Sequence, residues 1–215
     1  MKTVLALVLL MVGFGGSPCN KEKETCTLIT TGTQTFMDKN LVVVTYRNGD
    51  AIPQVTDQTA WASLTTGAWC HYNNDPANDT IYGKLYNWYA VNDPRGLAPQ
   101  GWHIPTVAEW TCFSISLGGE FVAGGKMKTT GTSRWNSPNT GATNESRFAG
   151  LPGGFRCGKN SCGGFGDIGN GGYWWTNAEN GSDGAWSRNL YYASKNLISS
   201  YGGKSSGFSV RCLRD

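Results

Sequence analysis

Glycine interrupts the second half of this chain so often that only short secondary-structure elements fit between the breaks. Thirty of the 215 residues are glycine, and nine tryptophans and nine tyrosines provide large flat side chains for a core. Glycine inside a helix or strand costs roughly 0.5–1 kcal/mol relative to alanine. We therefore predict an α+β fold with short antiparallel strands, one clear helix and long glycine-rich loops.

The helix is predicted over residues 106–117, where the string "IPTVAEW" opens a periodic apolar segment. Thr106 and Glu109 have the capping-box spacing, in which each side chain bonds a backbone N–H group of the first turn. Gly118 and Gly119 mark the end of the helix.

Strands are predicted at two places before this helix. A β-branched run at residues 41–45 leads into the turn signal Asn48-Gly49, and large side chains recur over residues 81–91. Runs of this kind, bounded by turn residues, are typical of strands and hairpins.

A polar loop with the sequence "HYNNDPANDT" precedes the second of these strands, and its side-chain oxygens could hold Ca²⁺. The loop lacks the spacing of a calcium-binding loop, and Asn and Asp also form turns by bonding their own backbone. Turn formation is therefore the favoured interpretation. The residues concerned are His71, Asn73, Asn74, Asp75, Asn78 and Asp79.

Residues 1–18 are predicted to be an export signal, because Lys2 precedes an apolar run too short to span a bilayer comfortably. We expect Cys19 to carry a lipid anchor, with residues 19–32 as a polar tether and residues 33–215 as one domain. An ordinary secreted protein is the alternative. The expected location is the bacterial cell envelope, as an outer-membrane lipoprotein or a secreted protein.

A net charge of +3 without a basic stripe argues against a nucleic-acid partner.

Six cysteines follow Cys19, and an even number in an exported chain favours disulfides, with fifteen possible pairings. Cys157 and Cys162 lie in the stretch "GGFRCGKNSCGGFGD". They could form a disulfide, remain a pair of free or redox-active thiols, or bind a metal ion together with other ligands. A disulfide across a hairpin tip is favoured, because a metal clip needs further ligands and the chain has only His71 and His103.

The stretch from Asn177 to Gly207 is rich in Asn, Ser, Gly and Tyr, a composition typical of binding surfaces. Aromatic rings supply contact area there, and small polar groups supply adaptable hydrogen bonds. We predict that a glycan or protein ligand binds this stretch. The candidate contact residues are Trp186, Arg188, Tyr191, Tyr192, Tyr201 and Lys204.

Catalytic motifs are missing from the sequence, which contains no Walker, H-E-x-x-H or G-x-S-x-G string. His103 stands between Trp102 and the predicted helix cap, and we interpret it as a packed, hydrogen-bonded residue. We expect no enzymatic activity.

Several strings, in order from about Thr33 to Asp215, resemble the Fibrobacter succinogenes major paralogous domain. They include "TYRNGDAIPQVTDQTAWASLTTGAW", "YGKLYNWYAVNDPRGLAPQGWHIPTVAEW", "GGKMKTTGTSRWNSPNTGATNES", "FAGLPGGFR" and "GFSVRCLRD". The resemblance implies an exported, often lipid-anchored surface protein with a C-type-lectin-like fold. A binding or adhesion module is the function that we expect, and a structural envelope component is an alternative.

A more distant resemblance links "IPTVAEW" and "GFSVRC" to the formylglycine-generating enzymes, which bind copper through a C-x4-C pair. Cys157 and Cys162 have that spacing, but Cys162 precedes Gly207 by 45 positions, with other segments between them. No catalytic residue is therefore carried over. A copper-dependent oxidase is the alternative function that this resemblance implies.

The family string "LCPxGWH" reads "LAPQGWH" in this chain, so Ala98 stands where the family commonly has cysteine. Cys112 lies on the predicted helix, where the family usually has another residue. Compared with the family pattern, the chain lacks a cysteine at position 98 and has one at position 112. The resemblance therefore implies a bridge between Cys112 and Cys212, which would join the helix to the last strand.

Overall fold

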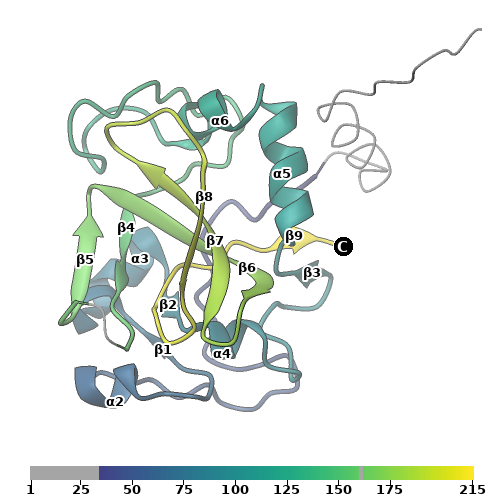
Figure 1. The fold of residues 1–215 in the computed structure, drawn as a ribbon, viewed down its shortest axis with the longest axis vertical. Coiled ribbons are helices and arrows are strands. Elements are labelled where there is room, and N and C mark those ends of the chain that lie inside the picture. Colours follow the sequence, from purple (N-terminus) through teal and green to yellow (C-terminus); the bar gives the residue numbers. More distant parts are fainter. Residues whose placement is uncertain (1–33, 160–161) are drawn as a thin grey trace, which may run out of the picture.

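The computed structural model describes residues 34–159 and 162–215 and has an α+β architecture (Figure 1). Most of its elements are short, as the glycine content predicts. None of the helices in these two ranges is long and apolar enough to cross a membrane. The helices are α2 (Gln58–Ala62), η1 (Tyr72–Asn74), η2 (Pro76–Asn78), α3 (Asp79–Tyr82), α4 (Trp88–Val91), α5 (Val107–Ser116) and α6 (Glu120–Met127). The strands are β1 (Trp69–Cys70), β2 (Leu85–Tyr86), β3 (Trp102–His103), β4 (Gly153–Arg156), β5 (Phe165–Ile168), β6 (Gly171–Asn180), β7 (Gly184–Tyr191), β8 (Ile198–Gly203) and β9 (Leu213–Arg214).

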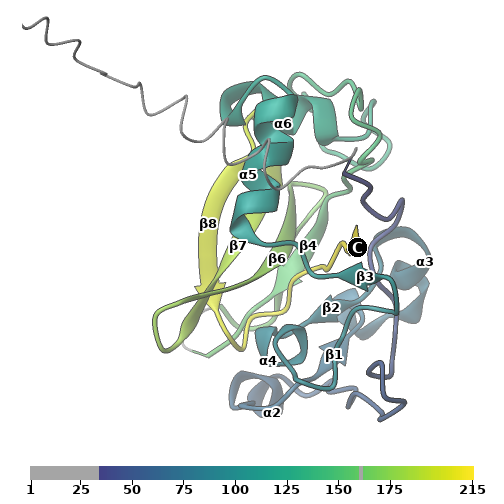
Figure 2. The same cartoon turned by 90° about the vertical axis from the view of Figure 1, so that its right-hand side faces the viewer.

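A five-stranded sheet in the order β5-β4-β6-β7-β8 forms the centre of the domain. Its strand pairs are antiparallel except β4 and β6, which run parallel, so the expectation of antiparallel strands holds for most of the sheet. Strand β8 lies at one edge of this sheet (Figure 2). Two small antiparallel sheets, β1-β2 and β3-β9, complete the fold.

Side chains alternate along β6 and separate two apolar clusters on the faces of the sheet. Trp174 packs with Trp110 of α5 and Met127 of α6. Its neighbours Tyr173 and Trp175 belong to the larger cluster on the other face. This period-two alternation is the reason that one strand can serve two cores. In Figure 2, α5 and α6 lie toward one end of the molecule, and α2 and α4 lie toward the other.

The predicted helix is confirmed as α5, including its capping box. The Thr106 hydroxyl accepts from the Glu109 backbone N–H at 3.1 Å, and the Glu109 carboxylate accepts from the Thr106 N–H at 2.8 Å. The helix ends at Ser116, and its C-cap residue Leu117 lies directly before Gly118 and Gly119.

A second helix, α6, contradicts the prediction of one clear helix. Its sequence includes Gly124 and Gly125, which sequence reasoning treats as helix breakers. The two glycines are needed because neighbouring loops press on the helix. A Cβ atom on Gly124 would lie 2.1 Å from the Asn196 carbonyl oxygen, and one on Gly125 would lie 2.4 Å from that of Gly141.

The two predicted early strands are wrong in most of their length. Residues 81–91 form the end of α3, the short strand β2 and all of α4. Gly83 has φ of 73°, and the Asn87 side chain caps α4 by accepting from the Ala90 N–H, so the chain turns at both places. Residues 41–45 make only one bridge, from Thr45 to Ala51, around the predicted Asn48-Gly49 turn.

Five cationic side chains of the described residues are buried inside the domain: Lys84, Lys128, Arg156, Arg188 and Arg211. Backbone carbonyl oxygens accept most of their hydrogen bonds. Lys128 illustrates this, because its Nζ donates to the carbonyl oxygens of Thr140, Tyr191 and Ser194 at 2.7–3.0 Å. Burial lowers the pKa of Lys128 to about 8, so the ammonium group keeps its charge at neutral pH. These cations stabilise the loops around them.

Candidate functional site

The six predicted contact residues do not form one site. Arg188 is 1% exposed, and its guanidinium donates to the Ser199 hydroxyl at 2.8 Å. Burial lowers its pKa. Tyr192 packs against the cluster under α5. Lys204 forms an ion pair with Glu179 at 3.0 Å and lies over the Trp88 ring. These three side chains are therefore part of the structure of the domain.

Trp186 and Tyr201 lie opposite each other on β7 and β8, with ring centroids 6.3 Å apart. The Tyr201 side chain is 66% exposed. Because directly opposite residues of an antiparallel pair point to the same face, both rings lie on the face of the sheet that carries Arg188.

Tyr191 borders a small pocket of about 210 Å³ on the opposite face of the sheet, which we call the sheet pocket. Buried Tyr173 and Phe208 stack with a centroid distance of 5.4 Å. Partly exposed Phe155 and Tyr191 meet the Tyr173 ring edge-on. The lining residues are Phe155, Cys157, Tyr173, Asn189, Tyr191, Ser200, Tyr201, Ser206 and Phe208.

The side-chain amide of Asn189 provides the sheet pocket with a hydrogen-bond donor. Its side chain is 4% exposed, and its Oδ1 accepts from the Ser187 hydroxyl at 3.1 Å. The hydrogen bonds found among the described residues leave its Nδ2 without an acceptor. Among the described residues, the fully buried side-chain atoms without a hydrogen-bond partner belong to other residues, so the Asn189 Nδ2 reaches the accessible space of the pocket and can donate to a ligand atom there.

Tyr173 fixes one wall of the sheet pocket. Burial raises its pKa, and its hydroxyl donates to Asp167 and interacts with Tyr191. Asp167 holds φ of 64°, an uncommon backbone conformation that places its carboxylate at the Tyr173 hydroxyl. These contacts orient the Tyr173 ring that forms this wall.

Sequence reasoning named Tyr191 and Tyr201 as contacts, although the Tyr201 ring lies on the other face, and named Cys157 only as a disulfide cysteine; it missed the other lining residues. Asn189 and Tyr191 are two residues apart on one strand, so strand alternation could have grouped them. Phe155 and Phe208 come from segments distant in sequence, and no local pattern could have joined them to β7.

The predicted disulfide between Cys157 and Cys162 is confirmed. The implied bridge between Cys112 and Cys212 is wrong, because Cys212 is a buried free thiol while Cys112 is bonded to another cysteine. Cys212 belongs to the larger apolar cluster, which also contains Val210 and Tyr86, so its side chain is part of the core. The Cys19 lipidation site and residues 1–32 lie outside the described residues.

We expect Cys70 and Cys212 to resist alkylation in the folded protein. Burial raises the pKa of Cys70 to about 11 and that of Cys212 to about 12, which leaves almost no reactive thiolate at pH 8. Differential alkylation with peptide mapping should label both only after denaturation, and Cys157 and Cys162 only after reduction. Labelling of Cys70 or Cys212 in the native protein would contradict the burial.

The polar loop makes the contacts expected of turn formation. Asp79 is shared between His71, at 2.7 Å, and the Lys84 ammonium group. Asn73 and Asn74 adopt positive φ angles, and Asp75 caps η2. Among the described residues, no group of three or more His, Cys, Asp or Glu side chains could hold a metal ion. The side chains proposed for Ca²⁺ are thus largely occupied.

His103 joins the ends of two elements, as the interpretation of a hydrogen-bonded residue predicts. Its Nε2 lies 2.9 Å from Glu109 of α5, and its Nδ1 lies 2.7 Å from Asp215. Burial alone would lower the pKa of His103, but the two carboxylates outweigh it and raise the pKa above 6.5.

This raised pKa predicts a small pH dependence of stability. The ion pairs contribute fully below about pH 6.5, where His103 is charged in both states, and their contribution is lost as pH rises through the folded-state pKa. We expect a loss of under about 1 kcal/mol in the free energy of unfolding between pH 6 and pH 8, because the pairs are partly exposed. Urea denaturation at both pH values should show this step, and His103→Gln should remove it. An unchanged step in that variant would assign it to another group.

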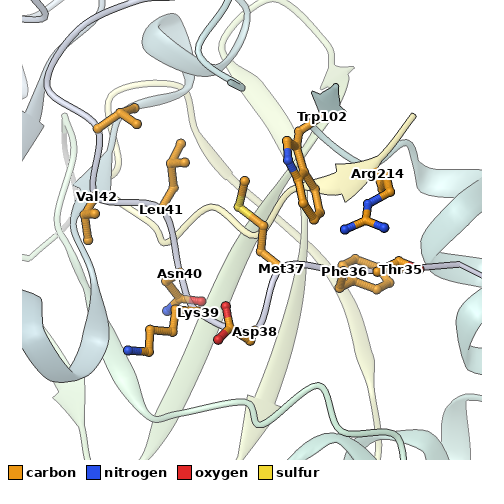
Figure 3. A pocket seen from close by; sticks show the side chains of 11 residues that line it. Thr35, Phe36, Met37, Asp38, Lys39, Asn40, Leu41, Val42, Trp102 and Arg214 are labelled. Carbon is orange, nitrogen blue, oxygen red and sulfur yellow. The ribbon is translucent and has the colours of Figure 1, made fainter. Parts of the chain in front are cut away.

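A second, larger pocket of about 530 Å³ lies between residues 35–43 and β9, and we call it the Trp102 pocket (Figure 3). Met37 and Trp102 lie side by side in it, and Arg214 lies 5.2 Å from the Trp102 ring centroid. Asn40 is already fully engaged, since its Oδ1 accepts from Trp174 and Arg211 and its Nδ2 donates to a backbone carbonyl. The charged side chains of Asp38, Lys39 and Arg214 also line this pocket, so its lining differs from the neutral lining of the sheet pocket.

The described residues thus define an α+β domain that carries a small aromatic pocket with a free amide donor on its central sheet. The chain belongs to the Fibrobacter succinogenes major domain family, whose model matches residues 29–214 and confirms the resemblance of its sequence strings. Comparisons with curated proteins and with solved structures found no match.

Proposed function

We propose that this protein is an exported binding or adhesion module of the bacterial cell envelope, which binds a glycan or protein ligand and catalyses no reaction. The observation that carries the proposal is the free Nδ2 donor of Asn189 in an aromatic pocket. A few placed polar groups among apolar walls are the usual composition of a ligand site. We also propose a C-type-lectin-like fold, supported by the family membership and by long loops around a central sheet.

Export is supported by the disulfide between Cys157 and Cys162. Disulfides persist in oxidising compartments such as the periplasm and the cell surface and are rare in the cytosol. The apolar run before Cys19 supports the same location, and a lipid on Cys19 would anchor the domain to a membrane.

The test uses the mature protein and two variants on an oligosaccharide array and a peptide array. Ser200 borders the sheet pocket on edge strand β8 and is partly exposed, so Ser200→Trp should fill the pocket without unfolding the sheet. Ser182→Trp is the matched control, because Ser182 is exposed in the turn between β6 and β7. We expect binding on one of the arrays by the wild-type protein and the control, and at least a tenfold loss in Ser200→Trp. Absence of binding on both arrays would contradict the proposal.

The copper-dependent oxidase remains the second candidate, and one observation favours it: Cys157 lines the sheet pocket. Both sulfur atoms would have to be thiolates to bind copper, whereas here they are bonded to each other. If the protein is a binding module, protein purified without reductant should keep this bridge and take up no stoichiometric Cu(I). Reduced Cys157 and Cys162 with one bound copper per chain would favour the oxidase instead. An intact bridge without any ligand on the arrays would favour a structural envelope component.

A further inference from the structure

We propose that the sheet pocket binds a single neutral sugar ring, the terminal or side-branch unit of a glycan. This inference rests on the proposed function and assigns the chemical class of its ligand. Charge, size, polarity and ring placement each restrict that class.

Among the residues that the structure describes, the lining of the sheet pocket carries no charged side chain. The nearest buried cation on β7, Arg188, points to the other face, where it contacts Ser199 and the Val107 carbonyl. The carboxylate of Asp167 is occupied by the Tyr173 hydroxyl. A charged ligand would lose its hydration without gaining an opposite charge, so the pocket favours a neutral one.

The pocket volume of about 210 Å³ is below the roughly 300–1,000 Å³ of pockets that take drug-sized ligands. It has room for about one six-membered ring with its substituents. A protein loop or a longer oligosaccharide could enter the pocket only with one unit, and the remainder would lie along the exposed edge of β8, where Tyr201 stands.

Polar groups in the pocket match the hydroxyl groups of a sugar. The Asn189 Nδ2 can donate, and the hydroxyls of Ser200 and Ser206 can donate or accept. The hydroxyl groups of a sugar ring both donate and accept hydrogen bonds, so they need acceptors as well as donors in the pocket. A ligand without hydroxyls would leave the Asn189 donor without an acceptor.

Aromatic rings in the pocket match the other feature of a sugar, its face of C–H groups. Phe155 and Tyr191 are partly exposed above the buried pair Tyr173 and Phe208. The faces of aromatic rings carry negative charge density and attract the weakly positive hydrogens of C–H groups. Free hydrogen-bonding groups and exposed aromatic walls therefore occur together in one neutral pocket.

The test is saturation-transfer NMR and calorimetry on the mature protein with glucose, galactose, mannose, xylose and N-acetylglucosamine. Glucuronate and galacturonate serve as charged sugars of the same ring size. We expect at least one neutral sugar to bind, and the charged sugars to bind at least tenfold more weakly. Asn189→Asp keeps the acceptor for Ser187 and removes the donor, so it should weaken binding at least tenfold.

Two further variants keep the test decisive if Asn189→Asp fails to fold. Ser200→Trp should abolish sugar binding by filling the sheet pocket, and Trp102→Ala, in the Trp102 pocket, should leave it unchanged. Binding of a peptide, or of charged sugars alone, that Ser200→Trp removes would overturn the sugar assignment but keep the proposed binding function. No binding of any probe, on the arrays or in solution, would overturn both.

Discussion

Replacing Arg211 with methionine should lower the free energy of unfolding by about 3 kcal/mol or more. The Arg211 guanidinium is 1% exposed and lies 4.5 Å from the Phe148 ring centroid. It donates to the Asn40 Oδ1 at 2.9 Å and to the carbonyl oxygens of Met37 and Phe148 at 3.1 and 2.6 Å. Methionine fills similar space but cannot donate, so the two carbonyl oxygens lose this donor inside the core, and the Asn40 Oδ1 keeps only Trp174 as a donor. Burial lowers the pKa of Arg211 to about 9, so the charge and its donors persist at pH 7.

Urea denaturation at pH 7 should measure this loss, with Arg214→Met as the matched control. Arg214 is exposed and contacts the Trp102 ring, so its replacement should cost less than about 1 kcal/mol. Equal effects of the two substitutions would show that the buried hydrogen bonds of Arg211 contribute little.

Replacing Gly124 with alanine should destabilise the protein by about 2 kcal/mol or more, although alanine favours a helix by roughly 1 kcal/mol over glycine. The new Cβ atom would lie 2.1 Å from the Asn196 carbonyl oxygen and 2.8 Å from the Leu197 nitrogen. Both are backbone atoms, and a hydrogen bond from the Gly125 N–H to the Lys195 carbonyl at 2.9 Å holds their loop against α6. The loop or the helix would therefore have to move.

Gly163→Ala is the control for this prediction, because Gly163 is exposed, has no positive φ, and has no heavy atom within 4 Å of an added Cβ. It should change the free energy of unfolding by less than about 0.5 kcal/mol. Denaturant titration of both variants gives the comparison. A neutral or stabilising effect of Gly124→Ala would mean that helix propensity outweighs the close approach of the loop.

The helix start at Thr106 and the bridge between Cys157 and Cys162 could be predicted because each depends on residues close in sequence. The capping box needs two side chains three positions apart, and the hairpin disulfide needs two cysteines five positions apart. The family strings had the same advantage, since each is a continuous segment. Errors arose where the deciding contact was distant, as at Gly124, whose role depends on Asn196.

The features of the candidate site also divide into those that local sequence predicts and those that depend on contacts between distant segments. The sequence by itself determined the family, the content of short elements, and a polar aromatic stretch near the C-terminal end. Only the tertiary structure decided that Arg188 is buried and that Phe155 and Phe208 join Asn189 in one pocket. Local sequence fixes dihedral angles and caps, because those interactions span a few residues. A pocket depends on which strands pair and on which face each side chain points to, and long-range packing sets both.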